Sequence, residues 1–183
     1  MDQGVLLKIL SFRVKDSATF NLLKEIITSY TAIPGQKVGM PIGNLASQIF
    51  ANIYLNELDR FIVHRLKTKN YLRYGDDFIV IEPDMGRLEL FKNQIIRFLN
   101  NELKLTVNPK SDKIIKVRHG LKLLGIKFWP SGRTLTKRNL LRLEKRLNIN
   151  NISSYSGLIK QHGNYKQIKR FDWLLYEKFL ADL

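Results

Sequence analysis

The chain has 183 residues, of which 44% are hydrophobic and 10% aromatic, so it can bury a core, and wholesale disorder is excluded. It has no cysteine, which excludes a disulfide framework, thiolate zinc sites and a cysteine nucleophile and is compatible with a reducing cytoplasm. No apolar run approaches the ~18 residues of a membrane span, and the first four residues do not resemble a signal peptide, so we expect a cytoplasmic protein without a membrane partner.

The positive charge is concentrated in the second half of the chain. Lys and Arg number 31 against 16 Asp and Glu, a net charge of +15, and residues 91–183 contribute +14 of it. This asymmetry predicts a polyanionic partner, and nucleic acid is the first candidate because neutralising phosphates releases counterions. The alternative is a ribosomal-type or merely well-solvated basic protein.

The predicted elements begin with two amphipathic helices, over residues 4–14 and 17–30, the second capped by Ser17. A loop over residues 31–39 precedes a longer helix over residues 45–66. The expected apolar face of that longer helix comprises Ile49, Ile53, Leu55, Leu58, Ile62 and Leu66.

The pattern changes at residues 71–82, where two short β-rich runs flank Gly75-Asp76-Asp77, which is typical of a hairpin. A helix is predicted over residues 87–103. Short strands are then predicted near residues 105–107, 113–117 and 121–128. Helical periodicity returns over residues 136–148, 154–162 and 165–181. A boundary near residue 130 therefore separates a mixed α/β part, residues 1–130, from an all-helical basic part, residues 131–183.

Asp76 and Asp77, at the tip of the predicted hairpin, form the sharpest candidate site. Two adjacent carboxylates repel each other and Asp disfavours strands, so the pair costs stability unless a cation binds it. Mg²⁺ prefers carboxylate oxygens, and two-metal phosphoryl transfer brings several carboxylates onto ions about 4 Å apart. The alternative is an ordinary solvent-exposed turn.

A second candidate site is the glycine-led start of the longer helix. Gly39, Pro41 and Gly43 lead into a first turn that carries Ser47 and Gln48. The free N–H groups and the dipole of a helix N-terminus suit an anion, and glycine allows close approach of a nucleotide or a base-paired strand. The alternative is a helix N-terminus with routine capping.

These features occur in an order that resembles a reverse transcriptase over essentially the whole chain. Residues 42–48, Ile-Gly-Asn-Leu-Ala-Ser-Gln, are similar to the family's template- and nucleotide-contacting motif, and Tyr74-Gly75-Asp76-Asp77 is similar to its Tyr-x-Asp-Asp metal-binding hairpin. Residues 98–113 resemble the following helix-strand motif, and Leu123-Leu124-Gly125 resembles the primer-grip hairpin. Because Tyr-Gly-Asp-Asp is also common among viral replicases, an RNA-dependent RNA polymerase is an alternative.

The variant of the template-contacting motif favours one group within the family. Most reverse transcriptases have Gln-Gly-x-x-x-Ser-Pro there, whereas this chain has Ile-Gly-x-x-x-Ser-Gln, followed by Phe-Ala-Asn-Ile-Tyr-Leu-Asn at residues 50–56. That combination, with the tail at residues 154–158, resembles the enzymes of bacterial or phage diversity-generating retroelements and their group II intron relatives. The retroelement enzymes copy a template RNA with errors at adenines and work with a small basic accessory protein.

The resemblance implies an α/β (α+β) fold: a polymerase palm remnant with an antiparallel sheet and packed helices, then a helical thumb. It also implies RNA-directed DNA polymerisation with an RNA template, a DNA primer or cDNA, dNTPs and two Mg²⁺ ions, for which Mn²⁺ can substitute. The implied catalytic metal ligands are Asp76, the more direct one, and Asp77. The implied nucleotide or template contacts are Gly43, Asn44, Ser47, Gln48 and Tyr74. The implied contacts to the nucleic-acid backbone are Arg138, Arg142, Lys145, Arg146, Lys169 and Arg170.

The chain departs from the family pattern in two places. A complete enzyme has fingers and another metal-binding Asp upstream, and Asp2 fits better as the end of that motif than as this ligand. We therefore expect a truncated or split enzyme that needs an upstream fingers–palm fragment, or a non-catalytic remnant that binds nucleic acid. Relatives often place a lysine, assigned as the acid that protonates the leaving pyrophosphate, where this chain has Ser111; Lys110 and Lys113 flank it as candidate substitutes.

Overall fold

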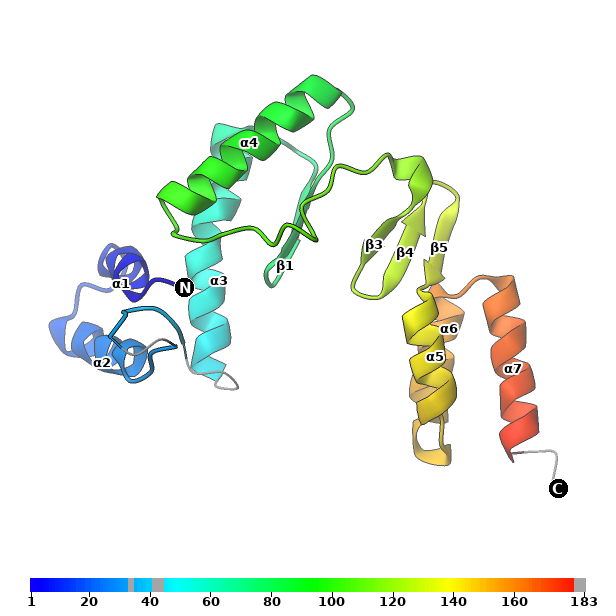
Figure 1. Cartoon of the computed structure of the whole chain (residues 1–183). Helices are drawn as coiled ribbons and strands as arrows, with labels where there is room; N and C mark the ends of the chain where they lie inside the picture. Colours follow the sequence, from blue (N-terminus) through cyan, green and yellow to red (C-terminus); the bar gives the residue numbers. More distant parts are fainter. Residues whose placement is uncertain (33–34, 41–44, 180–183) are drawn as a thin grey trace. The chain divides into compact units, whose positions relative to one another are not determined.

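A computed structural model describes residues 1–32, 35–40 and 45–179 of the chain (Figure 1). Backbone contacts divide the chain into two compact units, Met1–Asp112 and Lys113–Leu183. Each unit combines helices with a small antiparallel sheet, so the expected α+β class is confirmed at this coarse level. None of the helices within the described residues combines the length and the apolar composition that a bilayer span requires.

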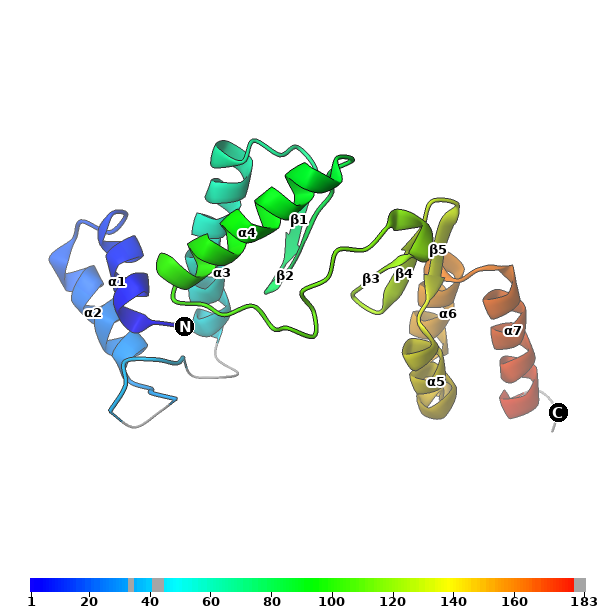
Figure 2. The same cartoon turned by 45° about the horizontal axis from the view of Figure 1, so that its top comes forward.

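The first unit contains four α-helices and a two-stranded hairpin among its described residues. The helices are α1 (Gln3–Ser11), α2 (Ser17–Thr28), α3 (Leu45–Arg60) and α4 (Met85–Asn101), and α3 continues into a π-helical turn (Phe61–Arg65). The antiparallel strands β1 (Tyr71–Tyr74) and β2 (Asp77–Val80) lie beside α3 and α4 (Figure 2). The N-cap of α2 is Asp16, which accepts from the Thr19 N–H at 2.7 Å, so the prediction of Ser17 is wrong by one residue.

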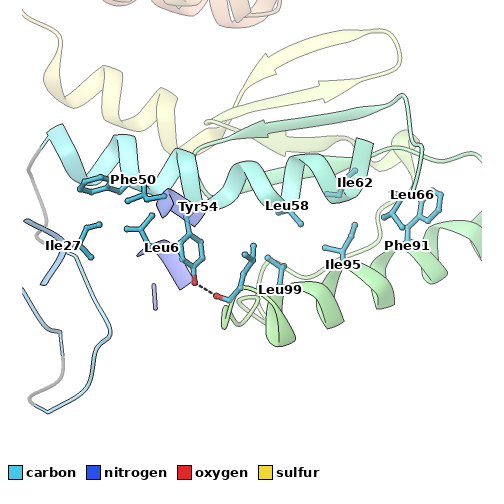
Figure 3. Close-up of a cluster of buried hydrophobic side chains, with 12 residues drawn as sticks. Leu6, Ile27, Phe50, Tyr54, Leu58, Ile62, Leu66, Phe91, Ile95 and Leu99 are labelled. Atoms are coloured by element: carbon cyan, nitrogen blue, oxygen red, sulfur yellow. Dashed lines mark hydrogen bonds between the residues drawn. The ribbon is translucent and has the colours of Figure 1, made fainter. Parts of the chain in front are cut away.

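The core of the first unit is one cluster of buried side chains packed along one side of α3 (Figure 3). On α3 and its π-helical turn the buried residues are Phe50, Tyr54, Leu58 and Ile62, spaced four apart. The predicted apolar face is wrong at Ile49, which is 52% exposed. The buried stripe runs through Phe50 and Tyr54 instead. The other helices contribute Leu6, Leu10, Ile27, Phe91, Ile95 and Leu99.

Two buried polar side chains tie this core to the loops around it. The Tyr54 hydroxyl donates to the carbonyl of Leu103, just beyond α4, as the dashed line in Figure 3 shows. Gln3 is only 2% exposed, and its Nε2 donates to the carbonyls of Ile27 at 3.0 Å and Tyr30 at 2.7 Å. Because buried polar groups need partners, these bonds fix α1 to the end of α2 and α3 to the end of α4.

As far as it is described, up to residue 179, the second unit contains a three-stranded antiparallel sheet, order β3-β4-β5, and three α-helices (Figures 1 and 2). Its elements are β3 (Leu121–Leu123), β4 (Ile126–Trp129), β5 (Gly132–Leu135), α5 (Lys137–Arg146), α6 (Ile152–His162) and α7 (Tyr165–Phe179). The strand predicted over residues 121–128 is interrupted, because Leu124 and Gly125 adopt positive φ, +50° and +79°, and form a two-residue turn. The strands predicted near residues 105–107 and 113–117 do not form.

The units divide between Asp112 and Lys113, whereas the sequence pattern predicts a boundary near residue 130. The sheet belongs with the helices because it shares their core, whose buried residues are Leu135, Leu143, Leu147, Ile159 and Phe171. Gln167 of α7 also forms two hydrogen bonds with the end of β5. Its Nε2 donates to the Leu135 carbonyl at 3.0 Å, and its Oε1 accepts from the Leu135 N–H at 3.1 Å.

Candidate functional site

The two aspartates of the candidate metal site occupy different backbone positions at the tip of the β1–β2 hairpin. Tyr74 pairs with Asp77, so the connecting turn is Gly75-Asp76 alone, one residue shorter than the predicted loop. Gly75 takes the first turn position with φ +61°, a left-handed conformation that glycine adopts without strain. Asp76 therefore stands in the turn itself, and Asp77 is the first residue of β2.

The strand register gives the hairpin two unlike faces, because successive side chains alternate and paired residues share a face. Tyr71 and Phe78 pack against the core of the first unit. Tyr74 and Asp77 lie on the opposite face with Leu72, and the Tyr74 ring is 64% exposed. Asp76 and Asp77 are both exposed. The hairpin therefore presents an aromatic ring and a carboxylate on one open face, beside the carboxylate in the turn.

Arg73 fastens the hairpin to α3. Its guanidinium makes two parallel bonds of 2.7 Å to the Asp59 carboxylate, from Nε to Oδ1 and from Nη2 to Oδ2. Its Nη1 donates to Asn52 Oδ1 at 3.2 Å and to the Gly75 carbonyl at 2.8 Å, and the Tyr71 hydroxyl donates to Asp59 Oδ1 at 2.7 Å. We call Arg73, Asp59, Asn52 and Tyr71 the Arg73 clamp. The clamp holds the turn that carries Asp76 through the backbone carbonyl of Gly75.

The protonation states of the Arg73 clamp are well defined. Burial alone would raise the pKa of Asp59, but the hydrogen bonds from Arg73 and Tyr71 outweigh it and hold that pKa below its ordinary value. The hydrogen bond to Asp59 raises the pKa of Arg73. Burial, with the nearby carboxylate, raises the pKa of the Tyr71 hydroxyl. The clamp therefore combines a carboxylate, a guanidinium and a protonated phenol over a wide range of pH.

The oxygen ligands at the hairpin tip are of the kind that binds a hard divalent cation. Asp76 and Asp77 offer carboxylate oxygens, the ligands that Mg²⁺ and Mn²⁺ prefer, and both are open to solvent. Within the described residues no group of three or more His, Asp or Glu side chains could hold a metal, and the tip offers two carboxylates. Asp2, which is not expected to be the missing metal ligand, caps α1, where its side chain accepts from the Val5 N–H at 2.9 Å.

The glycine-led motif is described only in part. Gly43 and Asn44 lie outside the described residues. Ser47 is half-buried and Gln48 exposed, both in the first turn of α3. Further along α3, Asn52 and Asp59 hold the hairpin through Arg73. One continuous helix, α3, therefore carries Ser47 and Gln48 as well as the two side chains that bond Arg73.

The two candidate lysines fall on either side of the division between the units. Lys110 is exposed, and its backbone N–H donates to Asn108 Oδ1 at 3.0 Å. Lys113 is the first residue of the second unit. Between them, Asp112 accepts from Lys92 Nζ at 2.9 Å, which ties this stretch to α4. Only Lys110 is therefore placed in the same unit as the two aspartates.

The basic residues predicted to hold the nucleic-acid backbone are all exposed in the second unit: Arg138, Arg142, Lys145, Arg146, Lys169 and Arg170. Arg138, Arg142 and Lys145 recur along one side of α5 at helical spacing. Arg170 has a partner within the unit, because its Nε donates to Glu144 Oε1 at 2.7 Å and so braces α7 against α5. Lys169 lies with its Nζ 4.9 Å from the centre of the Tyr165 ring.

No protein-family model matches this chain, and neither does any curated protein. Its function is therefore inferred from its own residues, the motifs they form and the geometry of the two units.

Proposed function

We propose that this chain is the palm-and-thumb part of an RNA-directed DNA polymerase, a reverse transcriptase that adds dNTPs to a primer along an RNA template. The observation that carries the proposal is the exposed Asp76-Asp77 pair, at a turn that the Arg73 clamp fixes to α3. Carboxylates that are held in place but open to solvent suit ions that bridge protein and phosphate.

The residues of the first unit have separate roles in this proposal. Bound divalent ions supply activation of the primer 3′-hydroxyl and neutralisation of the pyrophosphate. Asp76 and Asp77 provide oxygen ligands, and Tyr74, on the same face as Asp77, offers its ring beside the primer terminus. Ser47 and Gln48, at the start of α3, contact the incoming nucleotide or its templating base.

The second unit serves in this proposal as the thumb that holds the template–primer. It contains 16 Lys and Arg and four Asp and Glu, a net charge of +12. Arg138, Arg142 and Lys145 on one side of α5 bind phosphates, which gives affinity that falls steeply with salt and does not depend on sequence.

The finer assignment rests on the motif resemblance. We place the chain in a diversity-generating retroelement, where a small basic accessory protein is its partner. An upstream fingers–palm fragment supplies the remaining carboxylate ligand, which Asp76 and Asp77 need for a complete two-ion site.

The test is primer extension on an RNA template with dNTPs and Mg²⁺, with and without an upstream fingers–palm fragment. We expect extension by the wild-type chain plus fragment and none by the Asp76→Asn/Asp77→Asn variant, because carboxamides bind Mg²⁺ far more weakly than carboxylates. Glu89→Gln is the matched control, since it neutralises an exposed carboxylate on α4 and leaves the hairpin intact.

Two outcomes would overturn the proposal. Extension with ribonucleotides in preference to dNTPs would identify an RNA-dependent RNA polymerase instead. The absence of extension in every mixture, together with salt-sensitive duplex binding, would leave a non-catalytic nucleic-acid-binding remnant.

A further inference from the structure

One side of α7 carries a stripe of exposed aromatic and charged side chains. The stripe, called the α7 stripe below, consists of Tyr165, Lys169, Asp172, Trp173 and Tyr176. Its three rings are 69%, 62% and 52% exposed, in chain order. Their spacing along the helix keeps them on one side. Phe171, which is 2% exposed, packs into the core of the second unit, so a well-anchored helix presents the stripe.

Two pairs within the α7 stripe are in contact. The rings of Trp173 and Tyr176 lie 5.9 Å apart at an interplanar angle of 34°. Lys169 Nζ lies 4.9 Å from the centre of the Tyr165 ring. Lys169, Asp172, Trp173 and Tyr176 line an open hollow of about 390 Å³. Exposed large rings gathered in one patch are typical of binding surfaces, whereas single scattered rings are ordinary on a protein surface.

The positive charge of the second unit favours a polyanion as the partner of the α7 stripe. The second unit has a net charge of +12, and Lys166 and Lys169 lie on α7 itself. Aromatic rings with ammonium groups nearby suit single-stranded nucleic acid, because every unpaired base offers a face that stacks on an aromatic ring. Asp172 repels phosphate but accepts hydrogen bonds from amino groups of bases. A strand with bases against the rings and phosphates toward the lysines meets all these features.

We propose that the α7 stripe binds a single-stranded segment of nucleic acid by stacking unpaired bases on Trp173 and Tyr176. The proposal rests on the proposed polymerase function and deepens it. The second unit then holds an unpaired strand in addition to the paired template–primer that its α5 arginines contact. Stacking does not depend on base identity, so the stripe accepts any template sequence.

The fluorescence of Trp173 in the full chain tests this proposal directly. The chain has two tryptophans, and Trp129→Phe leaves Trp173 as the sole reporter. We expect single-stranded RNA or DNA of about 12 nucleotides to quench this fluorescence. An abasic strand of the same length and charge is expected to bind at low salt without quenching, and a blunt duplex to quench little because its bases are already stacked.

The affinity for single-stranded nucleic acid, measured in the chain that keeps Trp129, provides a second readout. Trp173→Leu is expected to weaken single-strand binding by about 5- to 150-fold and to leave duplex binding unchanged. Phe128→Leu, which truncates a ring of β4 that is 36% exposed and outside the stripe, is the matched control and should change neither affinity.

Equal quenching by abasic and base-bearing strands, or unchanged single-strand affinity of Trp173→Leu, overturns the stacking proposal. If duplex binding and primer extension persist in that case, the proposed polymerase function stands. Failure of the wild-type chain to bind any nucleic acid overturns both.

Discussion

At the scale of single residues, Arg73 is the side chain on which the candidate metal site depends most. It is only 13% exposed, and it bonds Asp59, Asn52 and the Gly75 carbonyl at once. A guanidinium makes such planar, two-point contacts with a carboxylate, whereas a lysine carries one ammonium on a flexible stem. The position of the turn that carries Asp76 is therefore sensitive to this one side chain.

Arg73→Lys is expected to lower the free energy of unfolding of the first unit by about 2 kcal/mol, because charge-assisted bonds to Asp59 are lost. Urea unfolding measures the loss, and hydrogen exchange should localise it to residues 71–80. Arg87→Lys is the matched control, since Arg87 is 59% exposed and lies 3.8 Å from Glu82. We expect that control to cost less than about 0.5 kcal/mol. Equal costs for both variants would contradict the importance of the clamp.

At the scale of elements, the two hairpins reach their two-residue turns in different ways. The β1–β2 turn places glycine at its positive-φ position, whereas the β3–β4 turn places Leu124 at φ +50° before Gly125. A bulky residue in the left-handed region costs roughly 1 kcal/mol, and Asn is better tolerated there. Gly125 cannot be replaced easily, because a Cβ would lie 2.1 Å from Asn139 Nδ2.

Leu124→Asn is accordingly expected to stabilise the second unit by about 0.5–1 kcal/mol, because Asn-Gly suits a turn with two positive φ angles. Gly125→Ala should destabilise the unit by more than about 1 kcal/mol. Thermal unfolding followed by tryptophan fluorescence measures both changes, because Trp129 and Trp173 both belong to the second unit. A lower melting temperature for Leu124→Asn than for the wild-type chain would show that the leucine side chain matters more than its backbone strain.

The bond between Tyr54 of α3 and Leu103 predicts a dependence of stability on alkaline pH. Burial raises the pKa of the Tyr54 hydroxyl from 10.0 to about 12, so its stabilising effect is complete below pH 10 and is lost as the pH rises through 12. Tyr54→Phe should cost about 1–2 kcal/mol at neutral pH, because the buried Leu103 carbonyl loses its donor.

Urea unfolding at neutral pH and near pH 12 measures how the difference between wild type and Tyr54→Phe shrinks. Tyr30→Phe, at a side chain 40% exposed, is the control and should show no such trend. A difference that stays constant with pH would contradict the role of the protonated hydroxyl.

Local patterns predicted the helices and the Asp76–Asp77 hairpin, because helical periodicity and a Gly-Asp turn depend only on residues that are close together in the sequence. The clamp was missed because Arg73 and Asp59 are separated by 14 positions and meet only through the hairpin register. The predicted buried face of the helix over residues 45–66 is right at Leu58, Ile62 and Leu66 but wrong at Ile49, because Ile49 and Phe50 are both apolar and tertiary contacts decide which of them is buried. The strand pattern over residues 121–128 ran through the β3–β4 turn because Leu124 is not a turn former by composition, whereas the resemblance of Leu123-Leu124-Gly125 to a hairpin motif did place a hairpin there.

At the scale of the whole molecule, the candidate metal ligands and most of the positive charge lie in different units. The first unit carries the exposed aspartates and a net charge of +3, and the second carries the exposed arginines and a net charge of +12. In the proposed enzyme this separation is functional. A strongly positive field centred on the aspartates would compete with divalent ions, whereas a positive second unit holds the polyanion.

The most direct measurement of the central claim is Mn²⁺-induced broadening of backbone amide signals in the NMR spectrum of the chain. It detects weak metal binding without requiring a complete enzyme. We predict that low concentrations of Mn²⁺ selectively broaden Gly75, Asp76 and Asp77, and that Asp76→Asn/Asp77→Asn abolishes this effect. Broadening confined to other acidic residues, or unchanged by the double substitution, would contradict the assignment of the hairpin tip as a metal site.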